Sequence, residues 1–159
     1  MIHLLDYGII GFLALLSIIA VSVAIERRMV YKRIDIDAFS DKKALELALT
    51  KKLHIIATIG SNAPYIGLLG TVLGIMITFH TMGQEGFMDP GKIMKGLALA
   101  LKATAAGLLV AIPSLTLYNF LLRRAKELIM QWEINHPAAA KPLADREPAT
   151  QITVADRNR

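Results

Sequence analysis

Three long stretches of the chain carry almost no charge, and short polar segments separate them. Residues 7–25 and residues 53–84 contain no Asp, Glu, Lys or Arg, and residues 96–122 contain a single charged residue, Lys102. A helix needs about 20 predominantly apolar residues to cross the hydrocarbon of a lipid bilayer. The pattern therefore predicts three transmembrane helices.

Turn and cap signals mark where the second and third helices begin. Residues 60–64 read Gly-Ser-Asn-Ala-Pro, so we expect an interruption there and a span that begins near Ala63. The third helix follows a short hairpin with turn signals at Gly86, Asp89, Pro90 and Gly91, and its pattern continues to His136. About 45 residues at about 1.5 Å each give a rod of about 68 Å, well beyond a membrane core of about 30 Å.

Lys and Arg are distributed unevenly around the three stretches. None precedes the first stretch, eight lie between Glu26 and Lys52, two (Lys92 and Lys95) lie around the hairpin, and seven follow the third stretch. Because positively charged loops stay in the cytoplasm, we expect an N-terminus outside and a cytoplasmic C-terminus. A cleaved signal peptide fits residues 7–25 less well, because its basic residues would precede the apolar core.

Composition supports a small membrane protein made of helices. Hydrophobic residues make up 54% of the 159 residues, the mean hydropathy is +0.47, and aromatic residues, at 6%, are too few for the girdles of a membrane β-barrel. The expected fold class is an all-α membrane protein. In chain order we expect an external N-terminus (1–6), a first span (7–25), a cytoplasmic loop with an amphipathic helix (26–62), a second span (63–82), a periplasmic hairpin (83–92), a third span (93–122), a cytoplasmic helix extension (123–136) and a disordered tail (137–159).

Several chemistries have no residues to support them. Cysteine is absent, which excludes disulfides and thiolate chemistry, and no pair of histidines has the i,i+4 spacing of a helical metal site. We therefore expect no metal, no cofactor and no enzymatic activity, since no catalytic constellation is present. The net charge of +5 comes from basic residues that flank apolar spans, so it indicates contact with the lipid bilayer and not with nucleic acid.

Small residues line one face of the second span and one face of the third. Gly67, Gly70 and Gly74 share a stripe at helical spacing. The corresponding ridge on the third span consists of Gly96, Ala100, Ala103, Gly107, Ala111 and Ser114. Such faces let two helix backbones approach closely, either within one chain or between copies, and both interpretations are open at this point. Pro113, in mid-span, is expected to give a packed kink.

Three threonines accompany these ridges. Thr71 and Thr78 form a polar stripe on the second span, and Thr104 lies beside the ridge of the third. A membrane threonine often bonds to its own carbonyl four residues back, which is a purely structural role. Repeated around a symmetric oligomer, the same hydroxyls could instead form a ring that lines a pore.

Lys102 is the charge inside the third stretch, and an intramembrane charge is a functional candidate. It lies six residues after Gly96, so its long stem can reach the outer interface of the bilayer. We favour this placement, or pairing with a carboxylate of a partner, over a role in relaying protons.

Two segments carry specific motifs in a fixed order, NAPYIGLLGTVLGIM at residues 62–76 and GLALALKATAAGLLVAIPSLTLYN at residues 96–119. Together they resemble the ExbB/TolQ/MotA family of proton-channel proteins, and the ExbB branch most closely. The resemblance implies a homopentamer whose second and third spans line a central pore in the bacterial inner membrane. That pore would hold an ExbD-like dimer of single-span proteins, and a TonB-like protein would carry energy to the outer membrane. The pore threonines of the family match Thr71 and Thr104.

One position departs from the family pattern, because Leu99 stands where the family has a glutamate in the third span. A chain without a carboxylate in its spans cannot itself bind and release a proton near neutral pH in mid-membrane. A partner is therefore expected to supply the titrating group, and the resemblance implies that this group is an aspartate of the ExbD-like protein, with Lys102 as a candidate charge partner. A TolQ-like stator for envelope maintenance and a non-conducting scaffold for membrane proteins are the alternative functions.

Overall fold

The computed structural model describes residues 2–85 and 89–137, and every regular element in them is an α-helix. The helices are α1 (Ile2–Arg33), α2 (Lys42–Thr50), α3 (Leu53–Glu85) and α4 (Pro90–Asn135). The all-α fold class is therefore confirmed. The centre of the expected hairpin and the expected disordered tail lie outside the described residues.

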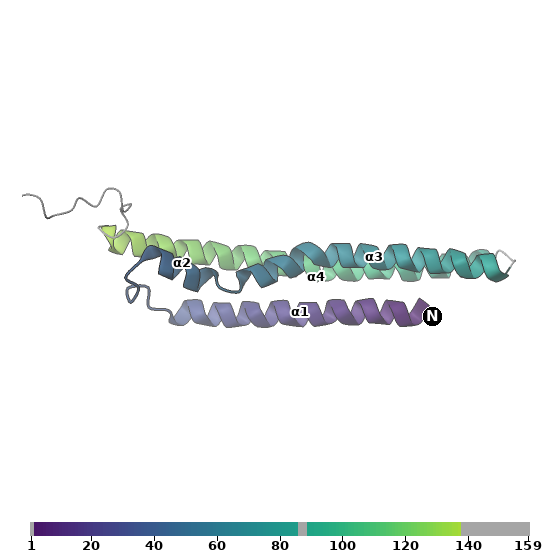
Figure 1. The fold of residues 1–159 in the computed structure, drawn as a ribbon, viewed down its shortest axis with the longest axis horizontal. Helices are drawn as coiled ribbons and strands as arrows, with labels where there is room; N and C mark the ends of the chain where they lie inside the picture. The colour runs from purple at the N-terminus through teal and green to yellow at the C-terminus, as the bar shows by residue number, and fades with distance from the viewer. Residues whose placement is uncertain (1, 86–88, 138–159) are drawn as a thin grey trace, which may run out of the picture.

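The molecule is an elongated bundle in which α1, α3 and α4 lie lengthwise side by side (Figure 1). The N-terminal end of α1 lies toward the end of the bundle where α3 passes into α4, and α2 lies at the opposite end beside the last turns of α4 (Figure 1). Three segments are long and apolar enough to cross a membrane, Tyr7–Arg33, Leu53–Gln84 and Pro90–Asn135. The chain is a membrane protein with three apolar helices, as the hydrophobic pattern predicted.

The break expected at residues 60–64 is wrong, because α3 runs through this segment, with Pro64 inside the helix. The polar side chains there return to carbonyls of the preceding turn instead of capping a new helix. Ser61 Oγ donates to Ala57 O at 2.9 Å, and Asn62 Nδ2 donates to Thr58 O at 2.8 Å. Packing against neighbouring helices lets membrane helices tolerate proline, and Gly60, one turn before Pro64, lies directly against Leu115 of α4.

The helix α4 begins at Pro90, inside the segment expected to be the hairpin (83–92) and three residues before the expected start of the third span at residue 93. The Asp89 carboxylate accepts a hydrogen bond from Gly91 N at 2.9 Å, and Pro90 occupies the first turn, where it loses no helical hydrogen bond. From there α4 continues through 46 residues without ending at Pro113. It therefore extends well past the apolar run that ends at Leu122.

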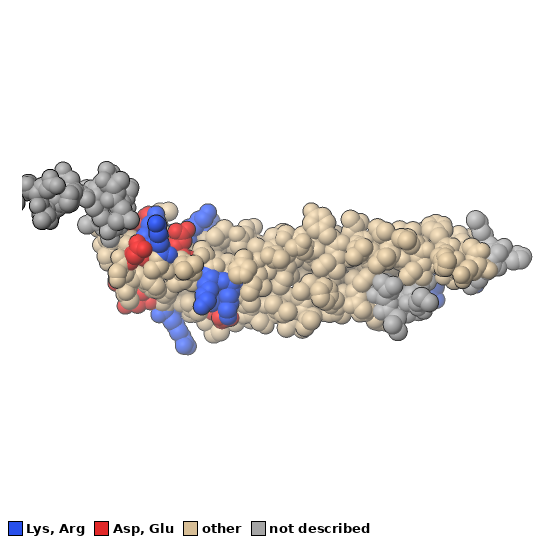
Figure 2. All heavy atoms as spheres, viewed as in Figure 1, with Lys and Arg blue, Asp and Glu red and all other residues tan. Residues whose placement is uncertain are grey.

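The end of the bundle formed by α2 and the last turns of α4 is here called the charged end, because the Lys, Arg, Asp and Glu side chains visible in Figure 2 gather largely there. Trp132 is fully buried and its Nε1 donates to Phe39 O at 3.0 Å. The Tyr31 hydroxyl donates to Leu49 O at 2.6 Å. Lys42 forms an ion pair with Glu133. Buried aromatic rings thus attach α2 and its preceding loop to both α1 and α4.

Candidate functional site

The contact between α3 and α4, here called the seam, is made by the two ridges of small residues. A Cβ placed on Gly67 would lie 2.7 Å from Ala103 O, and a Cβ on Gly107 would lie 2.6 Å from Ala63 O. Real Cβ atoms do not approach backbone oxygens this closely, so both positions need glycine for the helices to pack as they do. The ridges therefore pack against each other within one chain, which is the first of the two interpretations of the sequence.

The seam continues in both directions from this crossing. Gly74 faces Ala100, whose Cβ would lie 2.9 Å from a Cβ on the glycine. Gly70 faces both Ala103 and Ile9, so it marks the place where α1 meets the seam. Toward the charged end, Ala111 and Ser114 are buried, whereas Pro113 is exposed.

Midway along the length of the seam the side chains of Thr71 and Thr104 are hydrogen-bonded to each other, and we call them the hydroxyl pair. Thr71 Oγ1 also lies 3.1 Å from Ala100 O, and both hydroxyl oxygens lie 3.3 Å from Gly67 O. Each hydroxyl has one proton, so the pair has two donors for these acceptors. The pair is satisfied without any group from outside the chain.

The hydroxyl pair lies at an edge of the seam, on the side turned away from α1. Gly70 contacts Ile9 of α1, and Thr71 is about 100° further around α3. Thr71 is 9% exposed, whereas Thr104 is only partly buried. A small rotation of either side chain would therefore present a hydroxyl to whatever lies beside the α3–α4 face opposite α1.

Thr78 belongs to the seam but not to the hydroxyl pair. Thr78 is 4% exposed, and its hydroxyl donates to Gly74 O at 2.8 Å. A Cβ placed on Gly96 would lie 2.5 Å from Thr78 Oγ1. Seven residues separate Thr78 from Thr71, which is about 10 Å along the helix. The structure therefore brings together two of the three threonines singled out from the sequence.

Lys102 is exposed on α4, and within the described residues no carboxylate pairs with it. No Asp or Glu occurs between residues 53 and 84 or between residues 90 and 126, and Leu99 is partly buried. The second and third spans therefore hold hydroxyls, the exposed ammonium group of Lys102 and the exposed imidazole of His80, but no carboxylate.

The sequence analysis missed a polar cluster where α1 leaves its apolar run. Arg27 is 5% exposed, and its guanidinium contacts Glu26 at 3.2 Å and Ala48 O at 3.5 Å. Glu26 in turn pairs with Lys52 at 2.8 Å. Among the described residues Arg27 Nε has no hydrogen-bond partner. Three consecutive charged residues at 26–28, directly after the apolar run, could have indicated this cluster. They were interpreted only as evidence for the orientation of the first helix in the membrane.

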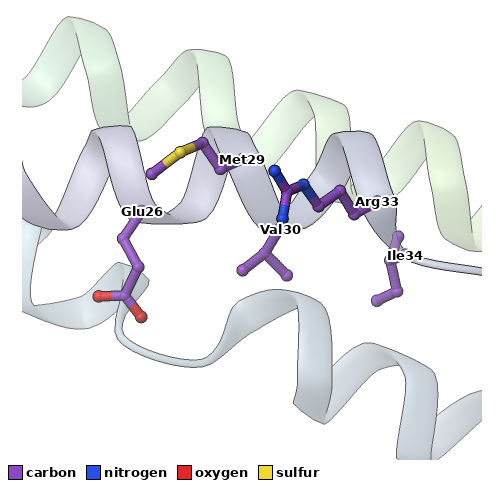
Figure 3. A pocket seen from close by; sticks show the side chains of 5 residues that line it. All are labelled: Glu26, Met29, Val30, Arg33 and Ile34. Carbon is purple, nitrogen blue, oxygen red and sulfur yellow. The ribbon is translucent and has the colours of Figure 1, made fainter.

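A pocket of about 370 Å³ lies beside this cluster, lined by Glu26, Met29, Val30, Arg33 and Ile34 (Figure 3). These five residues come from the last turns of α1 and the residue that follows it. None of these lining residues belongs to α3 or α4, so the pocket forms no part of the seam.

The fold and the seam define the class of the protein: a membrane protein of three apolar helices whose central polar groups are hydroxyls between two closely packed helices. The chain belongs to the MotA/TolQ/ExbB proton channel family, whose model matches residues 21–134. A transport-related role follows from membership of this family.

Individual relatives match most of the chain. It is 54% identical over 134 residues to the putative biopolymer transport protein ExbB-like 2 of Helicobacter pylori, which covers 84% of this chain and 89% of that protein. The biopolymer transport protein ExbB of Aquifex aeolicus is also 54% identical over 134 residues, covering 84% of this chain and 90% of that protein. The Tol-Pal system protein TolQ of Pseudomonas aeruginosa is 42% identical over 84 residues, covering 53% of this chain and 36% of that protein.

Proposed function

We propose that the chain is the ExbB-like stator subunit of a complex that uses the proton-motive force to power uptake across the outer membrane. The observation that carries the proposal is the hydroxyl pair at the seam, in a chain whose relatives named ExbB match it over most of both lengths. In this proposal the protein lies in the bacterial inner membrane, with its N-terminus in the periplasm and the charged end in the cytoplasm.

The proposed assembly is a homopentamer with a central pore. Because the Gly and Ala ridges are used within each chain, the pore wall comes from the α3–α4 face opposite α1, at whose edge the hydroxyl pair lies. Five copies arranged about an axis would place five such edges around the pore, with each α1 on the outside. Thr71 and Thr104 then line the proton pathway, and Thr78 extends it toward the hairpin.

In this proposal a partner supplies a titrating carboxylate, because the spans contain no Asp or Glu. An ExbD-like single-span protein provides a membrane aspartate, and protonation of that aspartate lets its helix move past apolar parts of the pore. The hydroxyl pair can rotate to solvate the charged form. One charge crossing about 100 mV yields about 2.3 kcal/mol, so a TonB-like protein that acts on the outer membrane needs several such steps.

Replacing the two hydroxyls tests the proposal. Thr71→Val or Thr104→Val should lower gradient-dependent uptake by about tenfold or more, because a hydrogen bond to a charged group is lost while the volume of the side chain is kept. Thr116→Val is the matched control, since Thr116 is exposed on α4 and its hydroxyl donates to Ile112 O of the same helix at 2.8 Å. Normal uptake by either seam variant at normal protein levels contradicts the pore role.

Two alternatives have distinct readouts. The TolQ relative supports a TolQ-like envelope-maintenance stator, which would co-purify with a TolR-like protein and whose loss would impair division instead of iron-dependent growth. A non-conducting scaffold would leave proton flux into liposomes unchanged when an ExbD-like partner is added. The proposed stator increases that flux.

A further inference from the structure

We infer that a second pocket, between α1 and α4 at the start of the charged end, binds the phosphate group of an anionic phospholipid from the adjacent leaflet. The pocket has a volume of about 360 Å³ and is lined by Arg28, Tyr31, Lys32, Phe120, Leu121 and Arg124. We call it the basic pocket. It differs from the pocket of Figure 3, whose lining includes a carboxylate, that of Glu26.

The charges of the basic pocket favour an anion. Within the described residues, neither Arg28 nor Lys32 forms an ion pair. Arg124 contacts Glu127 at 3.0 Å, but that single carboxylate is shared with Arg123 at 3.2 Å. These four basic side chains and one carboxylate leave a net charge of +3, and a phosphate at the pocket would reduce the repulsion among them.

The apolar part of the pocket indicates a lipid and not a free anion. Phe120 is 56% exposed and Leu121 is buried, and the Arg28 guanidinium lies 5.8 Å from the centroid of the Phe120 ring. Phe120 belongs to the apolar stretch of α4, and Arg124 follows the end of that stretch. A ligand with a phosphate beside an acyl chain matches this change from apolar to basic surface.

The pocket also lies at the depth where a headgroup is found. The apolar run of α1 ends at Ile25, three residues before Arg28, and the apolar run of α4 ends at Leu122, two residues before Arg124. The helices α1 and α4 run in the same direction (Figure 1), so both leave the hydrocarbon at the same level, with basic side chains directly beyond it. The identification of this leaflet as the cytoplasmic one depends on the orientation given under Proposed function. The position of the pocket at the edge of the hydrocarbon does not.

Native mass spectrometry of the full-length protein in detergent tests the inference, with phosphatidylglycerol, phosphatidylcholine and inorganic phosphate as separate probes. Arg28→Gln together with Lys32→Gln should weaken phosphatidylglycerol binding by about thirtyfold, since each basic side chain near an anionic lipid contributes a factor of about five. The matched control is Lys43→Gln together with Lys51→Gln, which removes the same charge from exposed positions elsewhere at the charged end. The control should bind phosphatidylglycerol like the unmodified protein.

Three outcomes overturn the inference. Equal losses in the two double variants indicate general surface charge, and displacement of the lipid by inorganic phosphate indicates a free-anion site. Failure of the assembled oligomer to bind phosphatidylglycerol indicates that another copy of the chain covers the pocket. Because lipid binding is measured without partners or a proton gradient, the result is independent of whether the stator function is correct.

Discussion

The seam and the charged end are stabilised in opposite ways. In the seam, two helices approach until glycines meet backbone atoms, and a Cβ on Gly107 would lie 2.6 Å from a carbonyl oxygen. At the charged end, large buried side chains such as Trp132 fill the space between the helices and the loop before α2. Polar contacts such as the Lys42–Glu133 ion pair lie at the surface. The seam therefore has almost no room for a larger side chain. The charged end is stabilised by large side chains, and shortening one of them should cause a smaller loss of stability.

Adding side-chain volume to the seam should have the largest effect. Gly107→Val has to separate the backbones of α3 and α4, and we expect a loss of stability of about 3 kcal/mol, the upper end of the range for overpacking. The measurement is unfolding in detergent by a mild denaturant. Gly83→Ala, where a Cβ meets nothing within 4 Å, is the control and should be neutral or slightly stabilising. Equal stability of Gly107→Val and the unmodified protein would show that the seam can relax.

Removing volume and a donor from the charged end should have an intermediate effect. Trp132→Phe loses part of a fully buried ring and the hydrogen bond to Phe39 O, so we expect a loss of about 1–2 kcal/mol. Hydrogen exchange should then increase in α2 and its preceding loop before it increases in α3. Increased exchange in α3 first would contradict the separation of the two regions.

The smallest expected effect is a pH dependence that belongs to the charged end. The ion pair with Glu133 raises the pKa of Lys42 above its ordinary value of 10.5. The pair therefore contributes its stabilisation fully below that value and loses it as the pH rises through the higher pKa of the folded state. The contribution is small because the pair is exposed to solvent. Lys42→Gln should flatten this part of the stability profile, and an unchanged profile would assign the dependence to another group.

The site was partly predictable from the sequence. Helical spacing placed Gly67, Gly70 and Gly74 on one stripe, and the structure places that stripe in the seam. Spacing within one helix carries no information about which residue of another helix lies opposite, so the contact between Thr71 and Thr104 could not be derived. The burial of Arg27 was missed for the same reason, because it depends on where α2 returns along α1.

The sequence by itself determined that the chain is a membrane protein of three apolar helices, because apolar runs of this length are stable only across a bilayer and helices satisfy their own backbone. The signals at Asp89 and Pro90 were assigned to the hairpin, with the third span beginning at residue 93, whereas in the structure they cap and open α4 at Pro90. Only the tertiary structure decided that α3 continues through Pro64 and that the small-residue ridges meet within one chain. These features depend on which surfaces come together in space, and such contacts can outweigh local preferences, which reach about 3 kcal/mol for a proline inside a helix.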